Sequence, residues 1–233
     1  MSKNPVAIVT GGSRGVGAAT AKILSANGWN VLVTCSSSIE AANIVAAECS
    51  SEISEVIAIK ANVANDEDCI HSVETAIKKW GRVDAVVNNA GTTKFVWNHG
   101  DLEGIDAEDF QNIYSVNVIG PFQMVRASKM HLLKSDNPNI INVSSIGGLK
   151  GIGSSIAYAA SKGALNSMTL SMARNLGPIK VNAVCPGFIE GEWLRKGMGE
   201  ETFEATKTHI ENTSPLGKTC SPESIAEVIY NLI

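Results

Sequence analysis

The feature that most constrains the fold is a regular alternation of short apolar segments with longer helical patterns. The apolar segments are rich in β-branched residues and apolar on both faces, which is typical of parallel strands covered by helices on each side. We expect strands over residues 6–10, 31–35, 56–60, 83–88, 139–144 and 180–185. The intervening patterns predict helices over residues 16–27, 39–50, 66–80, 107–134 and 155–176, with a last helix from Pro222. This order predicts an α/β fold built on one doubly wound, mostly parallel sheet of six strands.

The chain has 233 residues, a length that fits either one or two domains. No linker rich in Ser, Gly or Pro divides it, so we expect a single domain over residues 1–233. Residues 187–218 break the alternation after the sixth strand and mix large apolar residues with charges. An insertion at the carboxyl end of a strand predicts a substrate-binding lid, with an ordinary surface loop as the alternative.

The composition argues against several classes of function. The net charge is −4, so bulk charge does not favour nucleic acid as a partner. The five cysteines lack C-x-x-C spacing and the four histidines are scattered, which predicts reduced thiols, no disulfide framework and no metal site. The N-terminal segment lacks the apolar core of a signal peptide, and no apolar run is long enough to cross a bilayer. We therefore expect a cytoplasmic protein without a membrane partner.

A glycine-rich turn, TGGSRGVG at residues 10–17, lies between the first expected strand and the first expected helix. Its glycines at 11, 15 and 17 allow a tight turn and a close approach of a ligand to backbone amides. The start of a helix offers free N–H groups and the positive end of the helix dipole, which suit a pyrophosphate. Although the spacing differs from G-x-G-x-x-G, the turn predicts a dinucleotide site, with a purely structural turn as the alternative.

The residues around this turn favour one dinucleotide over another. NAD-binding sites often place a carboxylate at the end of the second strand, where it accepts hydrogen bonds from the ribose. Here Ser36, Ser37 and Ser38 follow that strand, and Glu40 is the first carboxylate. Arg14, inside the glycine turn, supplies a cation that suits a 2′-phosphate unless it is only a solvated surface charge. The pattern predicts NADP(H) rather than NAD(H).

Two residues suited to proton transfer lie in the helix expected over residues 155–176. Tyr158 and Lys162 are four residues apart and therefore lie on one face of that helix. An ammonium beside a phenol lowers the pKa of the phenol from about 10, which makes a tyrosine usable as an acid or base. Ser145 follows the fifth expected strand, where its hydroxyl could reach the same space. The three residues predict a catalytic group.

These motifs and their order indicate a family resemblance that covers nearly the whole chain. The chain resembles the short-chain dehydrogenases/reductases and is similar to their 3-oxoacyl-[acyl-carrier-protein] reductase-like subgroup. The resemblance rests on TGGSRGVG at 10–17, NNAG at 88–91, YSVNVIG at 114–120, INVSSIGG at 141–148, YAASK at 158–162 and PG at 186–187. It implies a Rossmann-type domain and an NADP(H)-dependent oxidoreductase that transfers hydride between the nicotinamide and a carbonyl or secondary alcohol.

The resemblance also implies a role for each catalytic residue. Tyr158 would exchange a proton with the oxygen of a small-molecule carbonyl or alcohol substrate, and Ser145 would hydrogen-bond that oxygen. Lys162 would lower the pKa of the tyrosine and bind the nicotinamide ribose. Asn117 would hold a water that joins Lys162 to solvent.

The same resemblance implies a set of cofactor-binding residues. They are Gly11, Ser13, Arg14, Gly15, Val16, Gly17, Ser36, Ser37, Asn62, Val63, Asn89, Ala90, Gly91, Tyr158, Lys162, Pro186, Gly187 and Ile189. Asn62 and Val63 stand where the family commonly has an Asp that contacts adenine, and an amide oxygen can still accept from the base. Gly191 stands where the family often has a Thr that contacts the carboxamide, and glycine cannot supply that hydroxyl.

The resemblance further implies a homo-dimer or homo-tetramer, because relatives commonly associate through the helices that here carry Asn117 and Tyr158. Relatives also usually continue past the last helix into a seventh strand. This chain ends at Ile233, in or just after the helix that begins near Pro222, so we expect that strand to be missing.

Three alternatives to a general carbonyl reductase stay open at this point. A 3-oxoacyl-thioester reductase would favour a basic patch for an acyl carrier protein, to which Arg126 and Lys129 could contribute. A non-catalytic dinucleotide sensor on the same fold would not need Tyr158 and Lys162. A SAM-dependent methyltransferase also uses a glycine-rich turn, but it gives no reason for Ser145 at this distance from those two residues.

Overall fold

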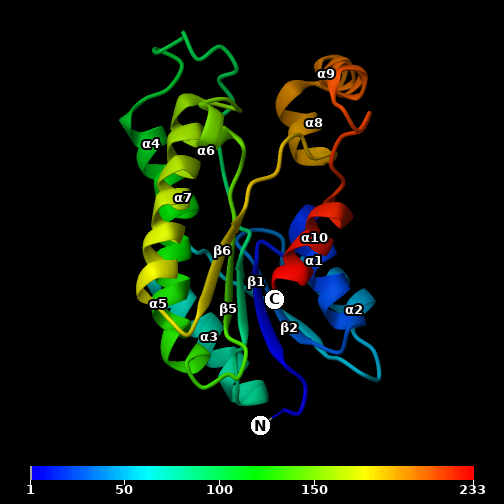
Figure 1. Cartoon of the computed structure of the whole chain (residues 1–233), viewed down its shortest axis with the longest axis vertical. Helices are drawn as coiled ribbons and strands as arrows, with labels where there is room; N and C mark the ends of the chain where they lie inside the picture. Colours follow the sequence, from blue (N-terminus) through cyan, green and yellow to red (C-terminus); the bar gives the residue numbers. More distant parts are fainter. Residues whose placement is uncertain (1) are drawn as a thin grey trace.

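The computed structural model describes residues 2–233, which form one six-stranded sheet between two layers of helices (Figure 1). The strand order is β3-β2-β1-β4-β5-β6, and every neighbouring pair is parallel. The strands are β1 (Val6–Thr10), β2 (Asn30–Cys35), β3 (Val56–Lys60), β4 (Ala85–Asn88), β5 (Asn139–Val143) and β6 (Lys180–Val184). The expected single α/β domain with six strands is confirmed, and its sheet is parallel throughout.

Two helical layers bury the two faces of the sheet. The helices are α1 (Gly15–Ala26), α2 (Ile39–Cys49), α3 (Asp66–Trp80), α4 (Ala107–Tyr114), η1 (Ser115–Ile119), α5 (Gly120–Leu132), α6 (Gly147–Lys150), α7 (Ile156–Asn175), α8 (Glu192–Met198), α9 (Glu200–Thr213) and α10 (Pro222–Leu232). Helices α1, α2 and α10 cover one face, and α3, α5 and α7 cover the other (Figure 1). Successive strand residues point to opposite faces, so Val9 joins the core under α1 whereas Ile8 joins the core under α3 and α5.

The helix expected over residues 107–134 is formed over residues 107–132, with a π-helical stretch in its middle that the sequence did not indicate. The π-helical stretch η1 separates α4 from α5, and it carries the fully buried Asn117. A π-turn changes the direction of the side chains within it, and such turns are frequent at functional sites. The mixed composition of residues 187–218 also gave no sign of the two helices, α8 and α9, that this segment forms.

The strand order reverses between β1 and β4, where the chain crosses from β3 at one edge to β4 in the middle of the sheet. The loops that leave these two strands therefore run to opposite sides and leave a crevice at their carboxyl ends. Thr10 joins the two strand ends, because its hydroxyl accepts hydrogen bonds from the backbone N–H groups of Asn89 and Ala90, both at 3.0 Å. The fold thus places a crevice directly above the glycine-rich turn.

At the amino ends of the strands, Asp84 joins three segments. Its carboxylate accepts hydrogen bonds from the backbone N–H of Val6 at 2.8 Å, the Ser135 hydroxyl at 2.6 Å and two nitrogens of Arg82 at 2.8 Å. Burial raises the pKa of the Asp84 carboxyl, but these hydrogen bonds outweigh burial, so the pKa lies below its ordinary value of 3.8. The charged form of Asp84 therefore stabilises the fold.

We predict that Asp84→Asn lowers the free energy of unfolding by about 2–4 kcal/mol at pH 7, because an amide cannot satisfy the same donors. Since the pKa of Asp84 is lowered in the folded chain, its contribution is complete above pH 3.8 and disappears as the pH falls through the folded-state value. The stability gap to wild type should therefore shrink in acid, as measured by urea unfolding. Glu74→Gln, on the exposed side of α3, is the control. Equal stabilities of wild type and Asp84→Asn at pH 7 would contradict this account.

Candidate active site

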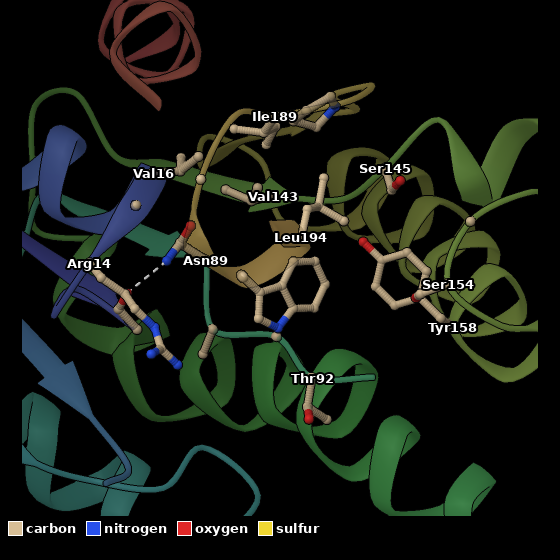
Figure 2. Close-up of a pocket in the computed structure, with 18 of the residues that line it drawn as sticks. Arg14, Val16, Asn89, Thr92, Val143, Ser145, Ser154, Tyr158, Ile189 and Leu194 are labelled. Atoms are coloured by element: carbon tan, nitrogen blue, oxygen red, sulfur yellow. Dashed lines mark hydrogen bonds between the residues drawn. The ribbon is translucent and has the colours of Figure 1, made fainter. Parts of the chain in front are cut away.

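The carboxyl ends of the strands open into one cavity of about 1090 Å³. All the site residues expected from the sequence line it except Gly17 and Asn117. Arg14 lies at one end of this cavity, and Ser145 and Tyr158 lie at the other (Figure 2). Segments far apart in the sequence are therefore brought to a single site.

The glycine-rich turn has the backbone that its sequence indicated. Gly11 and Gly15 adopt φ values of +65° and +54°, which residues with a Cβ rarely adopt. A Cβ on Gly17 would collide with the carbonyl oxygen of Gly11, so Gly17 is needed for packing although it does not line the cavity. The Asn89 side chain donates to the carbonyl oxygens of Thr10 and Gly11 at 2.9 and 3.0 Å, which fixes the turn against β4.

The start of α1 fits the pyrophosphate of a dinucleotide. Arg14 is the N-cap residue of this helix, and no side chain caps it. Gly15 and Val16, the first residues of α1, line the cavity, so the N–H groups of the first turn and the positive end of the dipole face the space where a phosphate would lie. This cradle, in a cavity lined from Arg14 to Tyr158, fits the dinucleotide that the sequence predicted.

The residues after β2 form the end of the cavity beside Arg14. Ser36 and Ser37 are exposed and line the cavity, whereas Glu40 lies in the first turn of α2 and does not line it. Within residues 2–233, Arg14 makes no ion pair. This end therefore presents an uncompensated cation and two hydroxyl groups, which can bind an anion.

Ser145 and Tyr158 meet at the opposite end, beside Lys162. The hydroxyl of Ser155 accepts a hydrogen bond from the backbone N–H of Tyr158 at 3.2 Å and thereby starts α7 at this point. The Lys162 ammonium donates to the carbonyl oxygen of Val143 at 2.8 Å and lies 5.7 Å from the centroid of the Tyr158 ring. The end of β5 and the first turns of α7 thus hold the three side chains in one group.

Burial controls the protonation of this group. Desolvation lowers the pKa of Lys162, which is 4% exposed, from 10.5 to about 8. Desolvation raises the pKa of Tyr158 above 10.0, and a hydrogen bond from Ser145 opposes that rise. The expected lowering of the tyrosine pKa by Lys162 is therefore wrong for this structure, because burial of the phenol outweighs the effect of an ammonium held against Val143.

Asn117 lies behind the cavity rather than in its wall. Its amide accepts from the backbone N–H of Thr92 at 2.8 Å and donates to the Thr92 carbonyl and the Ser161 hydroxyl, both at 3.0 Å. The π-helical turn is what places this side chain between the segment after β4 and α7. A Cβ on Gly91 would lie 3.6 Å from Asn117 Oδ1 and 3.8 Å from Lys162 Nζ, so both polar groups face the same glycine.

Residues 187–218 form much of the wall near Tyr158. A parallel bridge between Ile189 and Cys220 attaches this segment to the C-terminal part of the chain. Within the segment, Glu190 forms an ion pair with Lys207 of α9 at 2.8 Å. Leu194 of α8 faces the cavity near Ser145 and Tyr158 (Figure 2). Gly191 lines the cavity without a side chain, and Thr206 of α9 supplies the one hydroxyl that this segment, which is described throughout, brings to it.

Sequence reasoning missed several residues that shape the site. Thr10, Thr92 and Ser161 hold its backbone, and Trp97 lines the cavity. Thr10 lies at the end of a strand beside a glycine turn, a position where a hydroxyl often meets backbone groups, so that signal was available. The other three depend on contacts between distant segments.

The part of the chain that the structure describes contains no group of three or more His, Cys, Asp or Glu side chains placed to hold a metal ion. None of its helices is long and apolar enough to cross a membrane.

Comparisons with known proteins agree with this geometry. A family model described as short chain dehydrogenase matches residues 5–201. The chain is 38% identical to the ketoacyl reductase 2 assigned to the granaticin polyketide synthase of Streptomyces violaceoruber, over 98% of this chain and 89% of that protein. It is 34% identical to a 3-oxoacyl-[acyl-carrier-protein] reductase of Synechocystis, over 96% and 87% of the two chains.

A crystal structure assigned to the short-chain dehydrogenases/reductases, from Burkholderia xenovorans, superposes with a TM-score of 0.90 at 38% identity. The superposition covers 100% of this chain and 92% of that one. The fold, the site and the sequence matches over nearly the full length lead to one conclusion. This chain belongs to the short-chain dehydrogenase family, whose members are oxidoreductases that use a nicotinamide dinucleotide.

Proposed function

We propose that this chain is an NADP(H)-dependent carbonyl reductase that can also run as an alcohol dehydrogenase, with Tyr158 as its acid and base. The observation that carries the proposal is the single cavity with two chemically different ends. Arg14, Ser36 and Ser37 at one end suit a 2′-phosphate, and Tyr158 beside Ser145 suits a carbonyl oxygen.

The residues lining the cavity would hold the cofactor along its length. The glycine turn would bind the pyrophosphate, Asn62 and Val63 would contact the adenine, and Asn89, Ala90 and Gly91 would line the middle of the crevice. Near Tyr158, the nicotinamide would lie against Pro186, Gly187 and Ile189, with its ribose on Lys162. When bound, the nicotinamide supplies or accepts the hydride that the chemistry requires.

Tyr158 would donate a proton to the carbonyl oxygen during reduction and take it back during oxidation. Its raised pKa keeps the phenol protonated near neutral pH, so the resting enzyme is prepared to act as an acid. Ser145 would donate a hydrogen bond to the same oxygen as negative charge develops there. Near neutral pH, Tyr158 is therefore in the protonated form that the reduction step needs.

The names of two relatives favour a 3-oxoacyl-thioester reductase as a narrower alternative. Arg126, one of the two residues considered for binding an acyl carrier protein, forms an ion pair with Asp66. Its guanidinium also lies 5.6 Å from the centroid of the Phe122 ring. A dinucleotide sensor without turnover is the other alternative, and it predicts no effect of Tyr158 on any rate.

Two structural proposals accompany this function. Residues 187–218 would act as a substrate-binding lid, since α8 and α9 contribute to the cavity wall and lie outside the sheet layers (Figure 1). The chain would form homo-dimers or homo-tetramers through α5 and α7, which leave Phe122, Met130 and Leu170 45%, 64% and 61% exposed. Localisation in the cytoplasm is proposed on the same family basis.

We predict that Tyr158→Phe lowers the rate of carbonyl reduction by about 10²- to 10⁴-fold, because it removes the proton donor without removing the ring. The dissociation constant for NADPH, measured by calorimetry, should stay within about threefold of wild type if the cofactor contacts are retained. Tyr230→Phe in α10, outside the cavity, is the matched control. Full turnover in Tyr158→Phe would disprove the assigned role.

We predict that wild type binds NADPH more tightly than NADH and that Arg14→Ser weakens NADPH binding by about tenfold to a hundredfold. The reason is loss of a charge-assisted hydrogen bond to the 2′-phosphate. Binding of NADH, which lacks that phosphate, should change little. Lys22→Ser, on the outer side of α1, controls for the loss of a positive charge. Tighter binding of NADH than NADPH by wild type would contradict the choice of cofactor.

We predict that kcat/KM for carbonyl reduction is level from about pH 6 to 7 and falls above pH 8, where Lys162 loses its proton. Alcohol oxidation should instead increase with pH, because it needs Tyr158 as a base. In Lys162→Arg, any remaining reductase activity should lose the decline near pH 8, since a guanidinium stays charged. A reduction rate that rises between pH 6 and 8 would be inconsistent with Tyr158 as the acid.

A further inference from the structure

Three aromatic side chains, Phe95, Trp97 and Trp193, pack together at the substrate end of the cavity, and we name them the aromatic wall. Phe95 and Trp97 lie in the segment after β4, and Trp193 lies in α8. The centroid of the Phe95 ring is 5.3 Å from that of Trp97 and 5.7 Å from that of Trp193, with tilted planes. Rings at these separations attract one another beyond the effect of burial. The wall is therefore one packed unit made from two distant segments.

Gly197 of α8 joins the two segments. The indole N–H of Trp97 donates to the carbonyl oxygen of Gly197 at 3.1 Å. The Phe95 ring occupies the space where a Cβ of residue 197 would lie, so only glycine permits this contact. The position of Trp193 is thus tied to the segment after β4 as well as to its own helix.

The wall faces Tyr158. The centroid of the Trp193 ring lies 6.3 Å from that of Tyr158, with 51° between the planes. Trp97 and Trp193 both line the cavity, and each is 41% exposed. Tryptophans that served only to pack a core would be more deeply buried. Two partly exposed indoles beside Tyr158 offer a broad, flat, apolar surface to a ligand.

The charges near the wall favour an uncharged ligand. Glu190 is paired with Lys207 at 2.8 Å, and Glu192 is paired with Lys196 at 3.2 Å. Across residues 2–233, Arg14 and Lys162 are the basic residues that line the cavity. Arg14 lies at the far end, and the Lys162 ammonium is held by a backbone carbonyl. The substrate end thus offers flat apolar contacts and no spare cation for a phosphate.

We infer that the aromatic wall selects flat, uncharged ring ketones, such as ketones fused to an aromatic ring, over open-chain 3-oxoacyl groups. A flat ring can lie against the Trp193 indole while its carbonyl oxygen reaches Tyr158 and Ser145. An open chain can use the same two polar groups but has no face to stack. This inference rests on the proposed function, because it names a substrate class for the same site.

The test compares 2-tetralone, a ketone fused to an aromatic ring, with ethyl acetoacetate, an open-chain 3-oxo ester, by NADPH oxidation. Wild type should show a higher kcat/KM for 2-tetralone. Trp193→Leu, which keeps an apolar side chain but loses the ring face, should raise KM for 2-tetralone about five- to tenfold. Its KM for ethyl acetoacetate should stay within about twofold of wild type. Trp193→Phe should restore most of the affinity for 2-tetralone.

A binding measurement separates this inference from the proposed function. The probe 2-naphthol is flat and cannot be reduced as a ketone, and its binding is followed by quenching of tryptophan fluorescence. The dissociation constant of 2-naphthol should rise in Trp193→Leu by the same factor as KM for 2-tetralone. It should not change in Trp29→Leu, because Trp29 lies outside the cavity. If 2-naphthol binds tightly and this binding depends on Trp193, but neither ketone is turned over, the proposed function is wrong and the aromatic site is supported. Turnover of both ketones with equal kcat/KM, unchanged by Trp193→Leu, would overturn the aromatic site and keep the function.

Discussion

The junction between β1 and β4 is the constraint on which the rest of the site depends. Here one hydroxyl, that of Thr10, accepts from two consecutive backbone N–H groups, and the side chain of Asn89 returns hydrogen bonds to the glycine turn. These partly buried contacts fix the ends of the two strands at the point where the strand order reverses. The crevice for a dinucleotide and the start of α1 both follow from that fixed geometry. A looser junction would move the phosphate cradle relative to Tyr158.

The other half of the site depends on the packing of α6 against α7 and on hydrogen bonds between α7 and the end of β5. Gly148 lets α6 approach α7 so closely that a Cβ there would collide with the backbone of Lys162. The Ser144 hydroxyl donates to the carbonyl oxygen of Lys162 at 3.2 Å and ties the same strand end to the same helix. Ser144, the neighbour of Ser145 in the chain, thus has a structural contact of its own. Ser145 can meet Tyr158 because these small residues bring the two segments together.

The sequence predicted the features that depend on local pattern, and it missed those that depend on contacts between distant segments. Alternating apolar segments and a glycine turn are local, so the six strands and the phosphate cradle could be predicted. The π-helical turn at Asn117 is held by Thr92 and Ser161, which lie in other segments, so periodicity indicated the helix but not the π-helical stretch within it. The hydrogen bond from Trp97 to Gly197 of α8 could not be predicted from the sequence either, because it joins two distant segments. Burial reversed the expected pKa shift of Tyr158, because spacing along a helix gives no measure of desolvation.

The pKa of Lys162 indicates that the fold carries a cost at its candidate active site. A fall from 10.5 to about 8 corresponds to a destabilisation on the order of 3 kcal/mol by the charged form. The sign follows from proton binding: between pH 8 and 10.5 the unfolded chain holds the proton that the folded chain has released, so the cost is complete below pH 8 and disappears above 10.5. The buried Lys162 ammonium, which donates to the Val143 carbonyl, therefore does not stabilise the fold. A hydroxyl-rich ligand such as a ribose beside Lys162 would offset this cost, so the same charge that weakens the fold would strengthen binding.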